Sequence, residues 1–521
     1  MPSGHLRRYR EIAPSIPTPS NIDLNGTYSW HNYLEDTVNP PSKKPRDDIY
    51  CSENVVPVDT FYQAPLAQLM QCIDANVEAS NMGKAFTKPL YWFARVKKVA
   101  GYRLLLRYEG MDQSGDEVND FWVHIASSEI QRVGFCCDEG EGVLVPPESI
   151  VDRHSDWKEY VLCSIHGFRT LPLRWEEYRE KNIVRCKFKK GERVELLDAL
   201  VSMRVRPALI DDIIGDRVFV KLNKADLTGC GIFGDGKEED DPQISGVWMD
   251  QDSPLLFYVG WSIKVGYTLL ANESYVKHAT NVANALKAVR LNFEVFKGDS
   301  TLPLADCDAA PNLFKLYKDN MEDDDCKGNT FTEWKKDMKL EVLDPLDNWK
   351  ELRVGTVMEL LDDGYLKIGF DGGDMEEDTV PLHCSSPLLF PAGYAERFGI
   401  KLKHANIDKF EWKTYLKNQK ATAAPEGLFE NIEKLEEINH FQVGAKLEAV
   451  DLCEPFLICV ATVVARKGRL LKIKYDGWDD SYDQYFDFRS NNIYPLGWCE
   501  MYGHKLAAPK IEVRKKAKSK R

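Results

Sequence analysis

The stretch of the chain whose side chains could most directly do chemistry is KYDGWDDSYDQYF, from Lys474 to Phe486. It places three aromatic residues, Tyr475, Trp478 and Tyr482, among four aspartates with almost no aliphatic side chains. Aromatic ring faces carry negative potential, so rings that surround one small volume attract a cation, above all a weakly hydrated one such as a methylated ammonium. The spacing i, i+3, i+7 also fits one apolar stripe of an amphipathic helix, which would give the rings a packing role.

The neighbouring residues decide between a strand and a helix. Ile473 and Tyr475 alternate with lysines, which is the period of a strand. Asp476-Gly477 is a strong turn signal, and glycine inside a helix costs about 1 kcal/mol relative to alanine. We therefore predict a strand, a polar loop and a second strand that starts near Tyr482, an arrangement in which the three aromatic side chains can converge.

The chain contains four copies of one unit of roughly 100 residues. A first marker is a glycine and an aromatic residue, with a second glycine six positions after the first: GFCCDEG from Gly134, GWSIKVG from Gly260, GYAERFG from Gly393 and GWCEMYG from Gly497. A second marker precedes each of these: SWHNYL at Trp30, DWKEYV at Trp157, NFEVF at Phe293 and EWKTYL at Trp412. Short β-branched runs punctuated by Gly, Pro and Asp predict a small barrel or bent sheet in each unit, with a partly helical arm that packs against a neighbouring unit.

Tyr475, Trp478 and Tyr482, which we call the aromatic cage, occur together in one copy only. The two markers, in contrast, occur in all four copies. Copy three has Phe370, but Gly373 replaces the tryptophan and Glu377 the final tyrosine. Copy one has Met111 and Asn119 at these positions, and copy two has a polar, Gly-rich insertion there. Aromatics needed merely to pack the sheet should have persisted in all four copies, so this distribution favours a binding role.

The fourth copy resembles the malignant brain tumor (MBT) repeat almost throughout. The matching segments are KLEAVD (446–451), LICVATV (457–463), YDGWDDSYD (475–483), NIYPLGWCE (492–500) and GHKL (503–506). Four tandem copies resemble the four-MBT chromatin proteins. The resemblance implies a mainly β fold of four tandem MBT repeats, each a small bent-sheet or barrel core with a partly helical N-terminal arm, packed into one compact assembly.

The resemblance also implies a methyl-lysine-binding site, whose members would be Asp451, Tyr475, Trp478 and Tyr482, with Glu454 and Cys453 as further candidates. Asp451 would accept a charge-assisted hydrogen bond from a methylammonium that retains an N–H. That contact favours mono- and dimethyl-lysine over trimethyl-lysine, which has no proton to donate. Glu454 stands where many MBT repeats have asparagine, and this second carboxylate would either strengthen cation binding or alter the choice of methyl state.

The composition is that of a globular protein, and its net charge of −14 argues against nucleic acid as the main ligand. The basic end KIEVRKKAKSKR is the exception. Three interpretations of it stay open: a nuclear import signal, a weak nucleic-acid contact arm and a solvated tail. The 13 cysteines include no CxxC pair, and the histidines show no metal-ligand spacing, so we expect no metal and no cofactor. Without a signal peptide or a long apolar run, the chain is expected to be soluble and intracellular, with no membrane contact.

The resemblance to the four-MBT chromatin proteins implies a chromatin-associated methyl-lysine reader in the nucleus that acts in transcriptional repression. Its expected partners are methylated histone tails, with repressive marks on histone H3 as the leading candidates and H4 next, and other chromatin repressor proteins. No Gly-rich phosphate loop, nucleophile elbow or HExxH motif is present, so an enzyme is not expected. The alternative is a non-catalytic interaction scaffold for chromatin repressor complexes whose binding does not depend on methylation.

The markers also suggest where the units begin and end. We expect a flexible N-terminus over 1–27, repeat 1 over 28–150, repeat 2 over 151–275, repeat 3 over 285–406, the cage-bearing repeat 4 over 407–510 and a basic tail over 511–521.

Overall fold

The computed structural model describes residues 27–35, 55–62, 64–71, 75–81, 88–165, 169–183, 185–231, 241–289, 302–314, 330–375, 377–404 and 410–509. The first 26 residues, the NFEVF marker and the basic tail lie outside these ranges. The expectations stated above for those segments therefore stay predictions.

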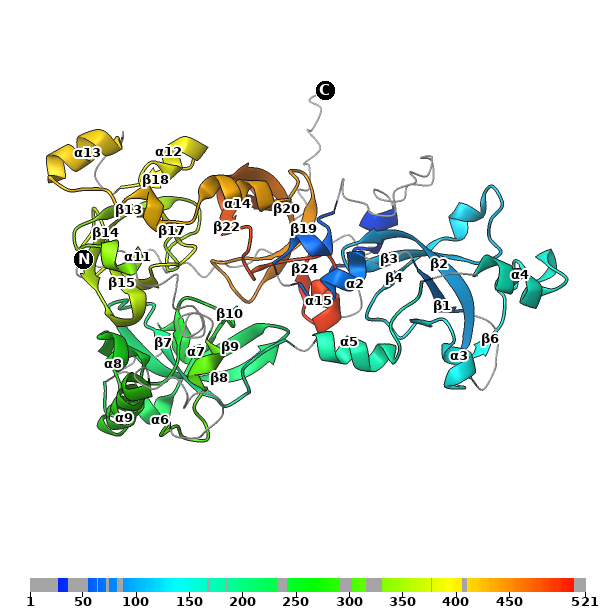
Figure 1. Cartoon of the computed structure of the whole chain (residues 1–521), viewed down its shortest axis with the longest axis horizontal. Coiled ribbons are helices and arrows are strands. Elements are labelled where there is room, and N and C mark those ends of the chain that lie inside the picture. The colour runs from blue at the N-terminus through cyan, green and yellow to red at the C-terminus, as the bar shows by residue number, and fades with distance from the viewer. Residues whose placement is uncertain are drawn as a thin grey trace, which may run out of the picture.

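Four six-stranded sheets follow one another along the chain, one in each repeat (Figure 1). Repeat 1 contains β1 (Asn76–Ser80), β2 (Leu90–Ala100), β3 (Arg103–Tyr108), β4 (Phe121–His124), β5 (Ile130–Arg132) and β6 (Val143–Leu144). Repeat 2 contains β7 (Arg193–Leu197), β8 (Arg204–Ile214), β9 (Arg217–Leu222), β10 (Val247–Asp250), β11 (Leu256–Phe257) and β12 (Thr268–Leu269).

The other two sheets have the same composition. Repeat 3 contains β13 (Lys339–Val342), β14 (Leu352–Leu360), β15 (Tyr365–Phe370), β16 (Thr379–His383), β17 (Leu389–Phe390) and β18 (Leu402–Lys403). Repeat 4 contains β19 (Lys446–Val450), β20 (Ile458–Lys467), β21 (Leu470–Tyr475), β22 (Gln484–Asp487), β23 (Ile493–Tyr494) and β24 (Leu506–Ala507).

All four sheets share one strand order, which in repeat 4 is β22-β21-β20-β19-β23, with β24 pairing parallel to β20. The second strand of each repeat is long, and its pairing with the third strand shifts by one residue, as between Val463 and Ala465. Such a bulge bends the strand and increases its twist. The long strand β20 can thus pair with β21 along one part of its length and with β24 along another. The sheet is curled as a result.

The helices are short and lie between or beside the sheets. Those of the first half are α1 (His31–Tyr33), η3 (Val58–Thr60), α2 (Ala67–Gln71), η4 (Asp116–Asn119), α3 (Phe135–Asp138), η5 (Val151–Arg153), α4 (Trp157–Ser164), α5 (Trp175–Ile183), α6 (Lys224–Leu227) and α7 (Pro242–Ser245). Those of the second half are α8 (Trp261–Val265), α9 (Glu273–Val289), η8 (Pro311–Leu313), α11 (Thr330–Glu333), η9 (Asp362–Gly364), α12 (Tyr394–Phe398), α13 (Trp412–Gln419), η10 (Glu426–Leu428), α14 (Ile432–Ile438), η11 (Asp480–Tyr482) and α15 (Trp498–Tyr502).

A buried glutamate in the first strand of each repeat explains the glycine marker. In repeat 4 the carboxylate of Glu448 accepts the N–H groups of Gly497, at 2.7 Å, and Cys499, at 2.8 Å. Gly497 has a φ of 92°, a left-handed conformation that glycine adopts at little cost. The same pair of contacts is made in the other repeats by Glu78, Glu195 and Glu341. The marker is therefore a short helix whose N-terminus is fixed to the sheet.

Each arm packs against the repeat before it, and the first arm packs against repeat 4. The indole Nε1 of Trp412 donates to Glu341 of repeat 3 at 2.6 Å, and that of Trp30 donates to Glu448 of repeat 4 at 2.9 Å. Parallel bridges follow the same scheme: Ala75 with Arg169, Arg193 with Asp308, Lys339 with Ala423 and Val55 with Lys446. In the arms of repeats 1 and 4, the tryptophan of the second marker is thus attached to the neighbouring repeat.

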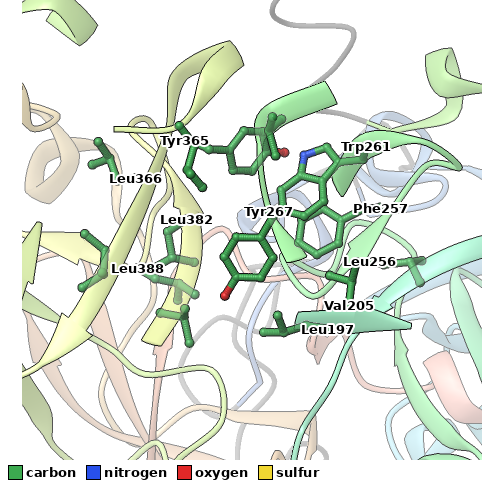
Figure 2. Packing of buried hydrophobic residues seen from close by; sticks show 14 of the residues in the cluster. Leu197, Val205, Leu256, Phe257, Trp261, Tyr267, Tyr365, Leu366, Leu382 and Leu388 are labelled. Atoms are coloured by element: carbon green, nitrogen blue, oxygen red, sulfur yellow. The ribbon is translucent and has the colours of Figure 1, made fainter. Parts of the chain in front are cut away.

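The repeats are joined by two continuous cores. Repeats 2 and 3 share one, in which Phe257 and Trp261 stack at 3.7 Å and Tyr365 of repeat 3 packs edge-on against Trp261 at 5.0 Å (Figure 2). Repeats 1 and 4 share the other, where Tyr102 N–H donates to Leu496 at 2.8 Å. Repeat 4 lies between repeat 1 and the pair formed by repeats 2 and 3 (Figure 1). The predicted mainly β assembly of four similar repeats is confirmed.

Candidate functional site

The stretch from Lys474 to Phe486, called the cage stretch below, forms the end of β21, a polar loop and the start of β22. Tyr475 is the last residue of β21, and the chain turns at Gly477, whose φ is 77°. The predicted second strand begins at Gln484, two residues later than expected, because Tyr482 ends a single 3-10 turn, η11. The Asp479 side chain caps this turn by accepting the Ser481 N–H at 2.9 Å.

The structure brings the three predicted aromatic residues to one end of the repeat-4 sheet. Tyr475 is almost fully buried, with 2% of its surface exposed, whereas Trp478 and Tyr482 are half-buried. The ring centres of Trp478 and Tyr482 lie 5.1 Å apart, and the ring planes are inclined at 60°. The backbone N–H of Trp478 donates to the Tyr475 carbonyl at 3.1 Å. Trp478 and Tyr482 are thus packed against the core cluster to which Tyr475 belongs.

Asp451 is joined to Tyr475 by a residue that was not predicted, Gln484. The amide Nε2 of Gln484 donates to Asp451 Oδ1 at 2.8 Å, and its Oε1 lies 2.6 Å from the Tyr475 hydroxyl. Leu452 N–H also donates to that Oε1, at 2.9 Å, which fixes the orientation of the amide. Burial raises the pKa of Tyr475 well above its usual value, so the hydroxyl keeps its proton and can donate. Gln484 therefore holds the carboxylate and the innermost ring in one arrangement.

The loop 451–457 carries the remaining predicted residues. Cys453 N–H donates to Asp451 Oδ1 at 3.0 Å, and the Cys453 thiol lies 3.4 Å from Gln484 Nε2. Although part of Cys453 is exposed, desolvation together with the charge of Asp451 raises the pKa of its thiol to about 11, so the thiol is neutral at physiological pH. Glu454 is half-buried, and its N–H donates to the Asp451 carbonyl at 3.0 Å in the turn after the aspartate. Asp451, Cys453 and Glu454 thus lie in one short turn.

Asp451 differs electrostatically from three of the four aspartates of the cage stretch, each of which pairs with a lysine. Asp476 pairs with Lys446 at 2.5 Å, Asp483 pairs with Lys472 at 2.8 Å, and Asp480 pairs with Lys474. No ion pair joins Asp451 to a residue in the described ranges, and the hydrogen bonds found there use its Oδ1 only. Among the described residues, its Oδ2 thus accepts no hydrogen bond and pairs with no cation.

A loop of repeat 3 borders the same site. The Trp349 carbonyl accepts the Tyr485 N–H at 2.7 Å, and the Cys453 thiol lies 3.6 Å from the Asn348 carbonyl. The ammonium of Lys350 lies 5.2 Å from the centre of the Tyr482 ring. The site is thus built mainly by repeat 4 but has one wall from repeat 3.

Sheet register identifies the corresponding residues of the other repeats. Leu222 of repeat 2 and Phe370 of repeat 3 occupy the position of Tyr475. The register aligns Val380 with Gln484, so Asp378, rather than Glu377, is the repeat-3 counterpart of Tyr482. The loop there is one residue longer, which equal spacing along the sequence does not reveal.

Sequence reasoning missed Gln484 and the repeat-3 loop. Gln484 could have been found by comparing the copies, because its counterparts are the apolar Phe121, Val247 and Val380. No sequence signal points to Lys350, because its place depends on how two repeats pack.

Within the described ranges, no group of three or more His, Cys, Asp or Glu side chains could hold a metal ion. The helices of this part of the chain are too short or too polar to cross a membrane.

Comparison with known proteins identifies the repeat. The family model of the mbt repeat matches residues 77–151, 192–276, 338–406 and 445–512. The chain is 32% identical to human MBT domain-containing protein 1 over 500 residues, which are 94% of this chain and 68% of that protein. It is 33% identical to Polycomb protein Sfmbt of Drosophila melanogaster, over 88% of this chain and 35% of that protein. It is 29% identical to protein lin-61 of Caenorhabditis elegans, over 94% of this chain and 78% of that protein.

A solved structure has the same arrangement of repeats. The crystal structure of the four MBT repeats of Drosophila melanogaster Sfmbt in complex with the peptide RHR(me)KVLR superposes with a TM-score of 0.74 at 31% identity. The match covers 94% of this chain and all of that one. The four family matches and this superposition confirm the resemblance seen in the sequence. The chain belongs to the MBT repeat family and carries four copies of the repeat in tandem.

Proposed function

We propose that repeat 4 binds methylated lysine and that the protein is a non-catalytic reader of methylated histone tails. The observation that supports this most is the combination, in one repeat of four, of three aromatic rings with a carboxylate that has no cationic partner among the described residues. The rings favour a weakly hydrated cation, and Asp451 supplies the opposite charge and a hydrogen-bond acceptor. The Sfmbt repeats, which are similar over the whole of their length, were crystallised with a methyl-lysine peptide.

The relatives also support a cellular setting for this proposal. Because one of them is named a Polycomb protein, we place this protein in the nucleus on chromatin and in transcriptional repression. We take repressive marks on histone H3 as the first candidate targets and H4 as the next, with other repressor proteins as partners. A methylammonium offers few atoms to bind, so the affinity should be modest, and occupancy on chromatin would depend on further contacts or on avidity.

The test is a titration with peptides that carry zero, one, two or three methyl groups on one lysine. RHRKVLR, the sequence crystallised with Sfmbt, and a histone H3 peptide are suitable. Binding should require methylation and should be lost in Trp478→Ala. Trp248→Ala is the matched control, because Trp248 is likewise half-buried but lies in repeat 2 against Phe219. Binding that ignores methylation, or that survives in Trp478→Ala, would exclude the reader function and favour a methylation-independent scaffold.

A further inference from the structure

One position on the second strand of each repeat lies beside the cage of repeat 4 or its counterpart in the other repeats, and three different residue types occupy it. It is the residue paired with Ala79, Leu196, Val342 and Ala449 in repeats 1 to 4. The residues at this position are Trp92, Arg206, Arg353 and Cys459, respectively. Three of them are large, and the small one belongs to the repeat that has the aromatic cage.

In repeat 3 the arginine at this position makes the contacts expected of a bound cation. The guanidinium carbon of Arg353 lies 3.9 Å from the centre of the Phe370 ring, the counterpart of Tyr475. Its Nη1 lies 2.5 Å from Asp344, the counterpart of Asp451, and its Nη2 pairs with Asp378. Aromatic face, carboxylate and cation are thus all present, and the cation comes from the chain itself.

Repeat 2 reaches a similar result without an aromatic ring. Arg206 is buried and lies 3.1 Å from Asp198, which stands at the position of Asp451. It also pairs with Asp241 and donates a hydrogen bond to the side-chain oxygen of Gln243. Asp241 and Gln243 come from the insertion between β9 and β10, so one effect of this insertion is to neutralise the buried arginine.

Repeat 1 is filled by a neutral group. Trp92 is buried, its Nε1 donates to the Glu109 carbonyl at 2.9 Å, and its ring packs edge-on against Trp157 at 5.3 Å. Asn81 stands where the other repeats have aspartate, so this repeat has no carboxylate at that position that needs a cation. In repeat 1, therefore, the neutral Trp92 occupies the strand position, and the neutral Asn81 occupies the position of the aspartate.

From these four cases we infer that Arg206 and Arg353 are internal ligands that occupy the sites equivalent to the repeat-4 cage, and that Cys459 determines which repeat can bind a cation from another chain. Cys459 lies close enough to Asp451 for the carboxylate to add to the effect of burial in raising the pKa of its thiol. Its side chain is too short to reach and neutralise Asp451, which leaves that role to an external cation. This role of Cys459 rests on the proposed methyl-lysine binding, whereas the assignment of the two arginines does not.

The first test restores an internal ligand to repeat 4. In Cys459→Arg, the guanidinium should pair with Asp451 and lie on Tyr475, as Arg353 does with Asp344 and Phe370. We expect at least a tenfold loss of affinity for the methylated RHRKVLR peptide, with cooperative unfolding retained. Cys459→Ala, which leaves the site open, should bind within about twofold of the wild type. A folded Cys459→Arg protein that binds as the wild type does would overturn the inference.

The second test removes an internal ligand and holds even if Cys459→Arg does not fold. In full-length Arg353→Ala, millimolar N-ethylguanidinium should raise the unfolding midpoint more than sodium chloride of equal ionic strength, and it should not do so in the wild type. If Arg353→Ala is unfolded in buffer, N-ethylguanidinium should restore its folded near-UV signal.

Equal effects of the two salts, or no restored signal, would overturn the assignment of Arg353. This assay uses no methylated peptide. A wild type that fails to bind peptide would therefore refute the proposed function without deciding this result.

Discussion

The ammonium of Lys350, in repeat 3, lies 5.2 Å from the centre of the Tyr482 ring, in repeat 4. A positive charge that belongs to the protein thus already lies beside one ring of the proposed cage. It opposes a second cation both by competing for the ring and by repulsion through space. The loop that carries Lys350 is fixed by the hydrogen bond between Trp349 and Tyr485, so this arrangement depends on the packing of the two repeats.

Removing this charge should strengthen binding. We predict that Lys350→Gln binds monomethylated peptide about threefold more tightly than the wild type, because one exposed charge near a binding site contributes roughly 0.5–1 kcal/mol. Lys350→Arg retains the charge and should bind like the wild type. The difference should shrink in high salt, where the charge is screened. An affinity for Lys350→Gln at or below that of the wild type would show that the loop supports the cage instead.

Asp451 should govern the choice of methyl state. We predict that Asp451→Ala weakens binding of mono- and dimethyl-lysine peptides by about tenfold or more, and of the trimethyl peptide by less, because only the first two can donate an N–H. Asp480→Ala, in the same region but already paired with Lys474, is the matched control. Equal losses across the three methyl states would leave Asp451 a purely electrostatic role, with Glu454 as a second source of negative charge.

Gln484 should matter although it has no place on the cage surface. Gln484→Val introduces the residue found at this position in repeats 2 and 3 and removes the link between Asp451 and Tyr475. An unpaired buried polar group costs about 1–3 kcal/mol, so we predict roughly tenfold weaker binding and a lower unfolding midpoint. Isothermal titration and thermal unfolding measure the two effects separately. Unchanged affinity would mean that the Asp451 turn holds its shape without the amide.

The contact between repeats 1 and 4 should weaken in acid. His124 is buried there, with Nε2 3.0 Å from the Gly497 carbonyl and Nδ1 accepting the Ala126 N–H, and burial lowers its pKa to about 4. The unfolded chain, with a histidine pKa of about 6.5, binds this proton more readily, so the contribution of His124 to stability is present above pH 6.5 and is lost as the pH falls towards 4.

The expected loss is measurable against a variant that cannot titrate at this position. Between pH 7.5 and 4.5 the wild type should lose about 2–3 kcal/mol more unfolding free energy than His124→Gln, since each pKa unit corresponds to about 1.4 kcal/mol. The buried carboxyl groups are common to both proteins and cancel in the comparison. His440→Gln, at an exposed histidine, serves as the control for the substitution itself. Parallel pH profiles of the wild type and His124→Gln would contradict the assignment.

The features that could be predicted from the sequence are those set by local pattern. The strand that ends at Tyr475, the turn at Gly477 and the four repeats follow from alternation, turn chemistry and spacing. The fold was predicted correctly because each marker is tied to one structural need, as Gly497 is to the carboxylate of Glu448. Asp451 and the aromatic residues could be named because they stand in one recognisable copy.

The features that were missed depend on tertiary packing. Gln484 acts through hydrogen bonds to residues of two other segments, and Lys350 arrives from another repeat. The position of Cys459 acquires meaning only when strand register aligns it with Arg353 and Arg206. Equal spacing along the sequence fails for Glu377, because a one-residue difference in loop length shifts the alignment to Asp378.

The most direct test of the central claim is to locate the methyl groups of the ligand. A peptide with ¹³C-labelled methyl groups on its lysine should show an upfield methyl shift on binding, because the methyls would face the rings of Tyr475, Trp478 and Tyr482. The shift should be abolished in Trp478→Ala and unaffected in Trp248→Ala. A peptide that binds without an upfield shift, or whose shift persists in Trp478→Ala, would place the methylammonium elsewhere and contradict the cage in repeat 4.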